Sequence, residues 1–324
     1  MDKKDLRIIF MGTPDFAVET LRALVDNQYN VVGVVTQPDK PVGRHGSVLQ
    51  PSAVKQFALA HNLPLLQPER MKDPAFIEQL AAWRANLQVV VAFRMLPEVV
   101  WAMPEYGTFN VHAALLPQYR GAAPINWAVI NGETQTGVTT FFLDQQIDTG
   151  RIIHQLTFDI PDDADVEYVY DGLMHLGARI CLETLDLIVE SDGHPRSIPQ
   201  PADTGDLKAA PKIFKDTCRI SWQQTAKRVY DFVRGLSPYP GAWTMLVDSD
   251  GNEQVLKLFR TTKTQLPATQ MHPGQLVADG RRHLYVAAAD CLLQIDELQV
   301  AGKKRMDTPA FLNGIKEIEN YFLI

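Results

Sequence analysis

Short apolar runs alternate with segments of helical periodicity through the first half of the chain. The runs Leu6 to Met11, Val31 to Thr36 and Leu87 to Ala92 are mostly apolar, which is typical of strands buried on both faces. Between them, Thr13-Pro14, Pro51 and Asp73-Pro74 are expected to open helices. This alternation predicts a mostly parallel β-sheet with helices on both faces.

The pattern changes after residue 190. Residues 191–211 contain four prolines and two glycines, which predicts a Pro-rich linker over 191–207. Beyond it, short strand-like segments are separated by turns such as Asp250-Gly251 and Asp279-Gly280, and Thr308-Pro309 is expected to open a helix to about Ile318. The predicted fold is therefore α/β: a Rossmann-like sheet in 1–190, then a small OB-like β-barrel in 208–324.

Cysteine usage and hydropathy favour a cytoplasmic protein. The three cysteines, Cys181, Cys218 and Cys291, are scattered, so no disulfide framework or Cys-x-x-Cys pair is available. The polar start of the chain predicts no signal peptide. The longest apolar run, Val89 to Phe93, is too short to span a bilayer.

Charge is distributed unevenly along the chain. The net charge is −7, which argues against a generally basic nucleic-acid binder. Residues 1–207 carry 15 Lys and Arg against 26 Asp and Glu, whereas residues 208–324 carry 16 against 12. Such a split favours a polyanionic partner for the C-terminal part, with chance scatter around neutrality as the alternative.

An asparagine, a histidine and an aspartate between residues 108 and 150 predict one reaction centre. If 108–112 is a strand, Asn110 and His112 share one face, and Asp148 arrives from a later loop. The carboxyl ends of strands are where open α/β sheets form their sites. A turn at Asp148-Thr149-Gly150 and a structural histidine are the alternatives.

These residue types suit acyl transfer to an amine. A carboxamide and an imidazolium can donate hydrogen bonds to a tetrahedral oxyanion, and Asp148 would favour the charged imidazole and orient it. His112 is followed by Ala113 and Ala114, so no nucleophile stands beside it and the acceptor must attack directly. A free α-amine, with a pKa of about 7.7–8, needs no strong base.

Other enzyme classes fit poorly. A second Asp-Thr-Gly begins at Asp203, but it lies in the polar linker, and the α/β first half contradicts an aspartic protease. The run Gly12 to Asp15 is not a Gly-x-Gly-x-x-Gly turn, which disfavours a dinucleotide enzyme. No metal-binding motif appears, so no metal is expected.

At this point the chain resembles the methionyl-tRNA formyltransferase family, along nearly its whole length. The Asn-x-His…Asp set alone would mark only the wider superfamily that uses 10-formyltetrahydrofolate. The other shared motifs are more specific: Phe-Met-Gly-Thr-Pro-Asp-Phe-Ala at Phe10 to Ala17, the loop Thr36 to Arg44, Arg-Gly-Ala-Ala-Pro-Ile at Arg120 to Ile125, and Ala-Gly-Lys-Lys at Ala301 to Lys304.

The resemblance implies formyl transfer from 10-formyltetrahydrofolate to the amino group of methionyl-initiator tRNA. The family's Ser-Leu-Leu-Pro folate-binding segment corresponds to Ala114, Leu115, Leu116 and Pro117, with alanine in place of serine. The family's pterin-side loop corresponds to residues 92–97, one residue shorter and with Arg94 in place of glycine.

Basic residues in two regions are candidate tRNA contacts. The Pro/Gly-rich loop 37–49 has the composition of an arm that gains order on a phosphate-bearing partner, and the family uses this loop to hold the acceptor arm. The alternative is a solvated surface loop. The candidates are Lys40 and Arg44 in the loop and Arg281, Arg282, Lys303, Lys304 and Arg305 in the second domain.

Two rival functions remain open at this stage. A sugar-amine formyltransferase would use the same folate donor with a different amine, and also carries a second domain. A non-catalytic RNA-binding protein would make Asn110, His112 and Asp148 dispensable. Nothing in the sequence demands more than a monomer.

Overall fold

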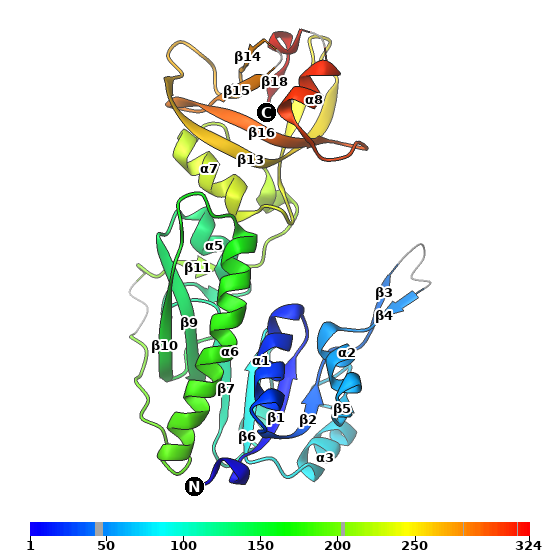
Figure 1. Cartoon of the computed structure of the whole chain (residues 1–324), viewed down its shortest axis with the longest axis vertical. Helices are drawn as coiled ribbons and strands as arrows, with labels where there is room; N and C mark the ends of the chain where they lie inside the picture. Colours follow the sequence, from blue (N-terminus) through cyan, green and yellow to red (C-terminus); the bar gives the residue numbers. More distant parts are fainter. Residues whose placement is uncertain (43–47, 202–204, 281, 316) are drawn as a thin grey trace. The chain divides into compact units, whose positions relative to one another are not determined.

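The computed structural model describes residues 1–42, 48–201, 205–280, 282–315 and 317–324 (Figure 1). Arg44, Asp203 and Arg281 therefore lie outside the described residues. The chain divides into two compact units: Met1–Gly121, Gln135–Asp159 and Tyr170–Ala209 form the first, and Ala122–Thr134, Ile160–Val169 and Ala210–Ile324 form the second. The units are interleaved along the chain, and the division at 190 and 207 stays a prediction.

A seven-stranded sheet forms the centre of the first unit, in the order β10-β9-β7-β6-β1-β2-β5 (Figure 1). Its five parallel strands are followed at one edge by the antiparallel β9 and β10. The mostly parallel sheet is as predicted. The strands are β1 (Arg7–Gly12), β2 (Asn30–Val35), β5 (Leu65–Leu66), β6 (Leu87–Val91), β7 (Thr108–His112), β9 (Gln135–Phe142) and β10 (Ile152–Asp159).

Helices cover this sheet, and their first residues carry recognisable start signals. Asp73 caps α3 by accepting from the Ala75 N–H. Two expected starts were slightly wrong: Pro14 is the N-cap of α1 rather than its first residue, and Ser52, not Pro51, caps α2. The helices are α1 (Asp15–Asp26), α2 (Ala53–Ala60), α3 (Pro74–Ala82), α4 (Glu98–Trp101) and α6 (Val166–Glu190), preceded by a short η1 (Lys3–Asp5).

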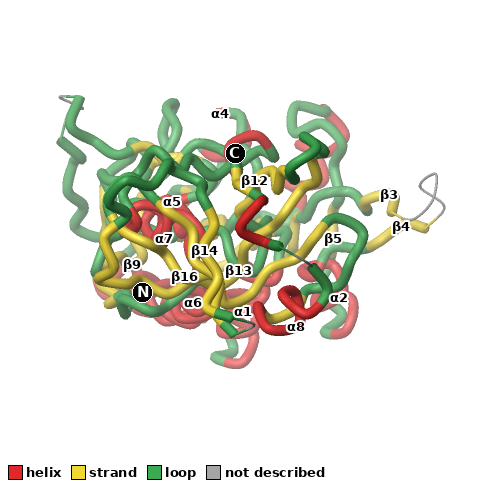
Figure 2. Tube along the Cα trace, turned by 90° about the horizontal axis from the view of Figure 1, so that it is seen from above, coloured by secondary structure: helices red, strands yellow, loops and turns green. Residues whose placement is uncertain are grey.

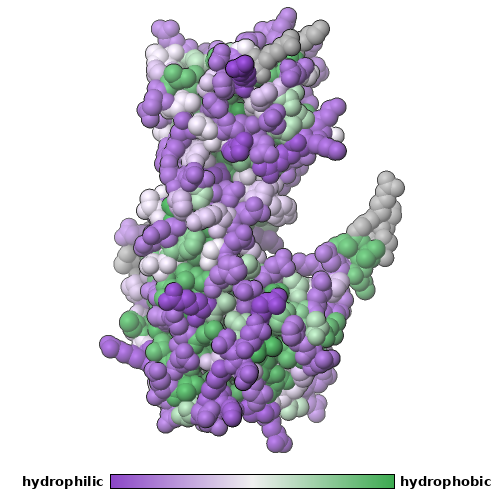
Figure 3. Space-filling view, viewed as in Figure 1, coloured by the Kyte–Doolittle hydropathy of each residue, from purple (hydrophilic) through white to green (hydrophobic). Residues whose placement is uncertain are grey.

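A small hairpin, β3 (Lys40–Val42) paired with β4 (Val48–Gln50), projects from the first unit (Figures 1 and 2). Its apolar side chains are exposed, Val48 by 58% and Leu49 by 65%, and they form a hydrophobic surface (Figure 3).

The second unit contains an antiparallel sheet in the order β14-β15-β16-β13-β12-β18, with β17 paired to β16. The sheet curls on itself, because the Leu323 N–H donates to the Gly274 carbonyl at 2.8 Å and Gln275 bridges Phe322. This agrees with the predicted barrel-like domain. The strands are β12 (Ala242–Val247), β13 (Glu253–Pro267), β14 (Leu276–Asp279), β15 (His283–Ala287), β16 (Cys291–Val300), β17 (Met306–Asp307) and β18 (Phe322–Leu323).

The helices of the second unit are α5 (Pro124–Ile130), α7 (Ala226–Gly235) and α8 (Thr308–Asn313), with η3 (Asp216–Cys218) and η4 (Ile318–Asn320). The expectation that the last helix reaches Ile318 was wrong, because α8 ends at Asn313 with Gly314 as its C-cap. The short strands β8 (Arg120–Gly121) and β11 (Ala209–Ala210) lie where the chain passes between units.

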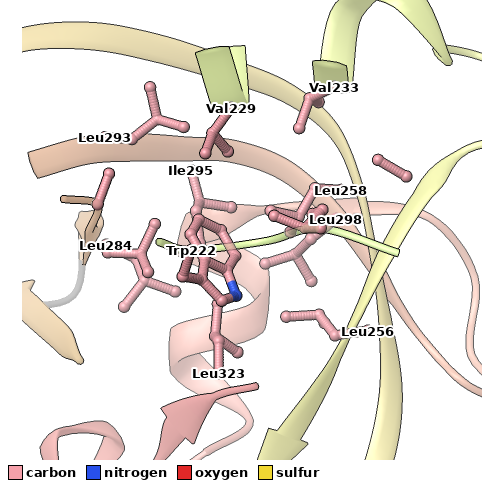
Figure 4. Packing of buried hydrophobic residues seen from close by; sticks show 14 of the residues in the cluster. Trp222, Val229, Val233, Leu256, Leu258, Leu284, Leu293, Ile295, Leu298 and Leu323 are labelled. Carbon is pink, nitrogen blue, oxygen red and sulfur yellow. The ribbon is translucent and has the colours of Figure 1, made fainter. Parts of the chain in front are cut away.

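Trp222 lies in the middle of the second unit's hydrophobic core (Figure 4). Its ring is surrounded by Val229 of α7 and by leucines and isoleucines of the curled sheet. Its indole N–H donates to the Thr244 hydroxyl at 3.0 Å, which satisfies the one polar group of this buried side chain.

Among the described residues, no helix combines the length and apolar character needed to cross a membrane.

Gly274 is the position where the closure of the curled sheet can be tested. Its φ is +90°, and a Cβ there would lie 2.0 Å from the Leu323 carbonyl oxygen. Gly274→Ala should therefore lower the free energy of unfolding by about 1–3 kcal/mol more than Gly251→Ala. Gly251 is a matched control, because its φ is +81° and nothing lies within 4 Å of its added Cβ. Equal losses in chemical denaturation would contradict this account.

Candidate active site

Asn110 and His112 lie in the last three residues of β7, in the middle of the first unit's sheet. Val111 between them faces Gly177 of α6, where a Cβ would meet its side chain at 3.5 Å. Because side chains alternate along a strand, Asn110 and His112 face the opposite side of the sheet from α6. His112 pairs across with Thr139 of β9.

Both ring nitrogens of His112 face oxygen atoms of the first unit. Nε2 lies 2.9 Å from the Tyr119 carbonyl oxygen, and Nδ1 lies 3.8 Å from Oδ2 of Asp148. A carbonyl oxygen can only accept, so Nε2 must carry the hydrogen of the neutral ring. Nδ1 is therefore the nitrogen without a hydrogen in the neutral ring, and it faces the Asp148 carboxylate.

Asp148 is held in an unusual backbone conformation. Its φ is +56°, in the left-handed region that is uncommon for residues other than glycine, and Oδ2 accepts from the Gly121 N–H at 2.9 Å. The side chains of His112 and Asp148 are 6% and 12% exposed. The expected convergence of imidazole and carboxylate is thus present in the geometry, at the end of β7 and within the first unit.

Asn110 has an unused polar end. Its Oδ1 atom is buried and has no hydrogen-bond partner among the described residues. Leaving such an atom unpaired costs about 1–3 kcal/mol, so the position is suited to a ligand or water. Rotating the carboxamide by 180° would present N–H groups there instead. The side chain can therefore act as a hydrogen-bond donor toward a bound group.

The segment 114–117 is tied to the sheet by two residues that the sequence did not single out. The Thr139 hydroxyl donates to the Ala114 carbonyl at 2.6 Å and accepts from the Leu116 N–H at 3.1 Å. Gln155 of β10 donates to the Leu116 carbonyl at 2.9 Å. Ala114 is fully buried, so a ligand could meet this segment only through its backbone or through Leu115 and Pro117, which are half-buried.

Arg94 fastens the neighbouring loop 92–97. Its guanidinium donates to the carbonyl oxygens of Pro68 and Glu69, the latter at 2.9 Å. Partial burial lowers the pKa of this guanidinium from its usual value. Arg94 therefore links the loop 92–97 to the backbone of residues 68 and 69.

The basic side chains predicted to contact tRNA differ in exposure and in whether they already pair with a carboxylate. Lys40 of β3, Arg282, Lys303 and Lys304 are exposed. Arg305 instead pairs with Glu297 at 2.6 Å and lies over the Phe259 ring.

Within the described ranges, no group of three His, Cys, Asp or Glu side chains could hold a metal ion.

Comparison with known proteins places this geometry in a family. Residues 6–185 match the formyl transferase family model, and residues 212–316 match the formyl transferase C-terminal domain model. Methionyl-tRNA formyltransferase of Parabacteroides distasonis is 61% identical over 99% of both chains, and that of Bacteroides fragilis is 58% identical over 99% of this chain and 98% of the relative.

The chain belongs to the methionyl-tRNA formyltransferase family. As expected, it is an enzyme of that family. Solved structures of other proteins share the fold. They include the sugar 3N-formyl transferase WlaRD (TM-score 0.64, 18% identity, 92% of this chain and 99% of that one) and HypX from Aquifex aeolicus with tetrahydrofolic acid (TM-score 0.61, 18% identity, 95% and 47%).

Thr139 offers a test of how the family's Leu-Leu-Pro segment is held. Thr139→Val removes the hydroxyl and leaves the Ala114 and Leu116 backbone groups unpaired in a buried position, which should cost about 2–3 kcal/mol of unfolding free energy. Thr139→Ser keeps the hydroxyl and should lose about 1 kcal/mol for one buried methyl group. Two equally stable variants would show that these hydrogen bonds contribute nothing.

Proposed function

We propose that this chain transfers the formyl group of 10-formyltetrahydrofolate to the α-amino group of methionyl-initiator tRNA. The observation that carries the proposal is the buried His112 facing the nearly buried Asp148, together with the unpaired Oδ1 of Asn110 and no serine or cysteine next to the histidine in sequence. Full-length identity of 61% to a relative with that name supports the choice of acceptor. Such a reaction belongs in the cytoplasm, where aminoacylated tRNA is used.

In the proposed reaction the neutral amine attacks the formyl carbon directly. A carbon–nitrogen bond forms, the bond from the formyl carbon to the folate nitrogen breaks, and the proton lost by the amine ends on that folate nitrogen. The oxyanion is stabilised by the Asn110 carboxamide and by the positive charge of a protonated His112. Asp148 supports the imidazolium and exchanges a proton with Nδ1.

The proposed folate site consists of two segments near the C-terminal end of β7: residues 114–117 and the loop 92–97. The segment Ala114, Leu115, Leu116 and Pro117 would offer its backbone and the half-buried Leu115 and Pro117 side chains. Loss of the family's serine hydroxyl at Ala114 is compatible with this, because that side chain points into the protein and is fully buried. The loop 92–97, held by Arg94, would form the pterin side.

An acceptor panel tests the function itself. The wild-type chain is assayed with 10-formyltetrahydrofolate and one of three acceptors: methionyl-initiator tRNA, a nucleotide-sugar amine, or water. Turnover on the tRNA alone is the expected result. Turnover on the sugar amine would instead favour the sugar-amine formyltransferase, whose fold this chain shares. Binding of tRNA without turnover on any acceptor would favour a non-catalytic RNA-binding protein.

Asp148→Asn tests the carboxylate of the proposed centre. The amide can still accept from the Gly121 N–H, but it is uncharged and cannot take a proton from Nδ1. We expect kcat to fall about 10²- to 10⁴-fold while tRNA affinity stays within a few-fold. Asp144→Asn in the same loop is the control, because an asparagine can accept the Gln146 and Thr149 hydrogen bonds equally well. Parallel loss of activity and tRNA affinity would mean that Asp148 is structural.

Among the proposed tRNA contacts, the exposed Lys303 and Lys304 are the most direct to test. Arg305 is already neutralised in part by Glu297, Lys40 and Arg282 are single exposed charges, and Arg44 and Arg281 remain proposals from sequence. The hydrophobic surface on the β3–β4 hairpin would add an uncharged contact beside Lys40.

Replacing Lys303 and Lys304 by alanine should raise KM for tRNA several-fold and leave kcat nearly unchanged. Each lysine–phosphate interaction that the substitution removes should reduce the slope of log affinity against log salt by about 1. Lys72→Ala, an exposed lysine of the first unit, is the control and should change neither quantity. A salt slope equal to that of the wild type would remove these lysines from the interface.

A further inference from the structure

Gln200 lies in the segment expected to be a linker, yet its side chain reaches the Asp148 turn. Its Nε2 atom donates to the Asp148 carbonyl at 2.9 Å and to the Gly150 carbonyl at 2.8 Å. Its Oε1 atom accepts from Arg120 Nη2 at 2.7 Å and from Nε at 3.1 Å. One half-buried carboxamide thus joins the site turn to β8, and all its partners lie in the first unit.

The orientation of this carboxamide follows from its partners. Backbone carbonyls can only accept hydrogen bonds, and a guanidinium can only donate them. The NH₂ end must therefore face the turn, and the oxygen must face Arg120. The next residue, Gly121, donates its N–H to the Asp148 carboxylate. Backbone and side chain of the Asp148 turn are thus held from two adjacent residues of β8.

The segment around Gln200 is itself docked on the sheet. Ile198 pairs with Ile152 at the start of β10 through two backbone hydrogen bonds of 2.8 Å. Arg151 also donates to Ser197, through Nε to the hydroxyl at 2.9 Å and through Nη2 to the carbonyl. The backbone pairing of Ile198 and the bond to the Ser197 carbonyl hold this segment, and both remain when the Ser197 hydroxyl is removed. Ser197→Ala is therefore a suitable control.

The Asp148 turn needs such support because its backbone is strained. At φ +56° a non-glycine residue is less stable than in the right-handed region, by up to about 1–2 kcal/mol and by less for an aspartate with local hydrogen bonds. Surrounding contacts help to keep it there. Relaxation at this residue would rotate the Cα–Cβ bond and carry the carboxylate away from His112 Nδ1.

We propose that Gln200 is a positioning residue for the reaction, which holds the Asp148 carboxylate opposite His112 through the Asp148 and Gly150 carbonyls. Arg120 orients the Gln200 amide and so takes part in the same task. This inference rests on the proposed function, since it assigns Gln200 to the centre formed by Asn110, His112 and Asp148.

The test compares Gln200→Ala and Gln200→Glu with Ser197→Ala. The glutamate keeps the size of the side chain and its contact with Arg120, but it has no hydrogen to donate to the two carbonyls. Both Gln200 variants should lower kcat about 10- to 100-fold with KM values within about three-fold of wild type. Ser197→Ala should retain wild-type kcat. Wild-type kcat in Gln200→Glu would overturn the proposal.

A double-mutant cycle separates positioning from general destabilisation. If Gln200 acts through the carboxylate, Gln200→Glu should have almost no further effect on kcat in the Asp148→Asn background. The pH dependence of kcat should also change in the same direction in Gln200→Glu and Asp148→Asn. Full additivity of the two losses would assign Gln200 a merely structural role and overturn the inference.

A measurement that needs no substrate keeps this inference distinct from the proposed function. The imidazole nitrogen resonances of His112, in protein labelled with ¹⁵N-histidine, should change in the same direction in Gln200→Glu and in Asp148→Asn, and not in Ser197→Ala. Unchanged resonances in Gln200→Glu would overturn the inference even if the wild-type chain formylates tRNA. Failure of the acceptor panel with shifted resonances would overturn the function alone.

Discussion

The contact between a buried imidazole and a nearly buried carboxylate is the constraint on which the rest of the site depends. His112 directs Nε2 at the Tyr119 carbonyl, so Nδ1 is the ring nitrogen on the side that Asp148 occupies. The proposed chemistry needs this arrangement. The proposed role of the pair depends on the distance between Nδ1 and the carboxylate and on the angle between the two groups. His112 and Asp148 do not set either of these by themselves.

Several polar residues with no chemistry of their own set that geometry. Thr139 and Gln155 hold the segment that follows His112, and Gly121 holds the carboxylate of Asp148. Each makes hydrogen bonds to groups that would otherwise be unpaired in a buried region. The antiparallel strands β9 and β10 supply two of them, so this end of the sheet serves to fix the loops around the site.

Prediction from sequence succeeded where the pattern was local and strong. The strands β1, β2 and β6 were predicted correctly, because a loop rarely carries such a continuous run of apolar residues. β10 was not predicted, because His154 and Gln155 interrupt its apolar residues. As the strand at the edge of the sheet, it is also only partly buried. α8 ends earlier than predicted, because Asn313-Gly314 is a stop signal for a helix. The strands β17 and β18 are two residues long and exist only through pairing.

The sequence by itself determined the class of fold, the family, and the three residues at the centre of the proposed chemistry. The fold class follows from hydrophobic periodicity, the family from its resemblance to known motifs, and the three residues from side-chain types that suit acyl transfer. All of these are properties of the chain alone. The tertiary structure decided which His112 nitrogen faces Asp148, that Ala114 is buried, and that a residue of the expected linker supports the turn at Asp148. Those features are hydrogen bonds and packing between residues tens of positions apart, and such contacts arise only when the sheet brings distant segments together.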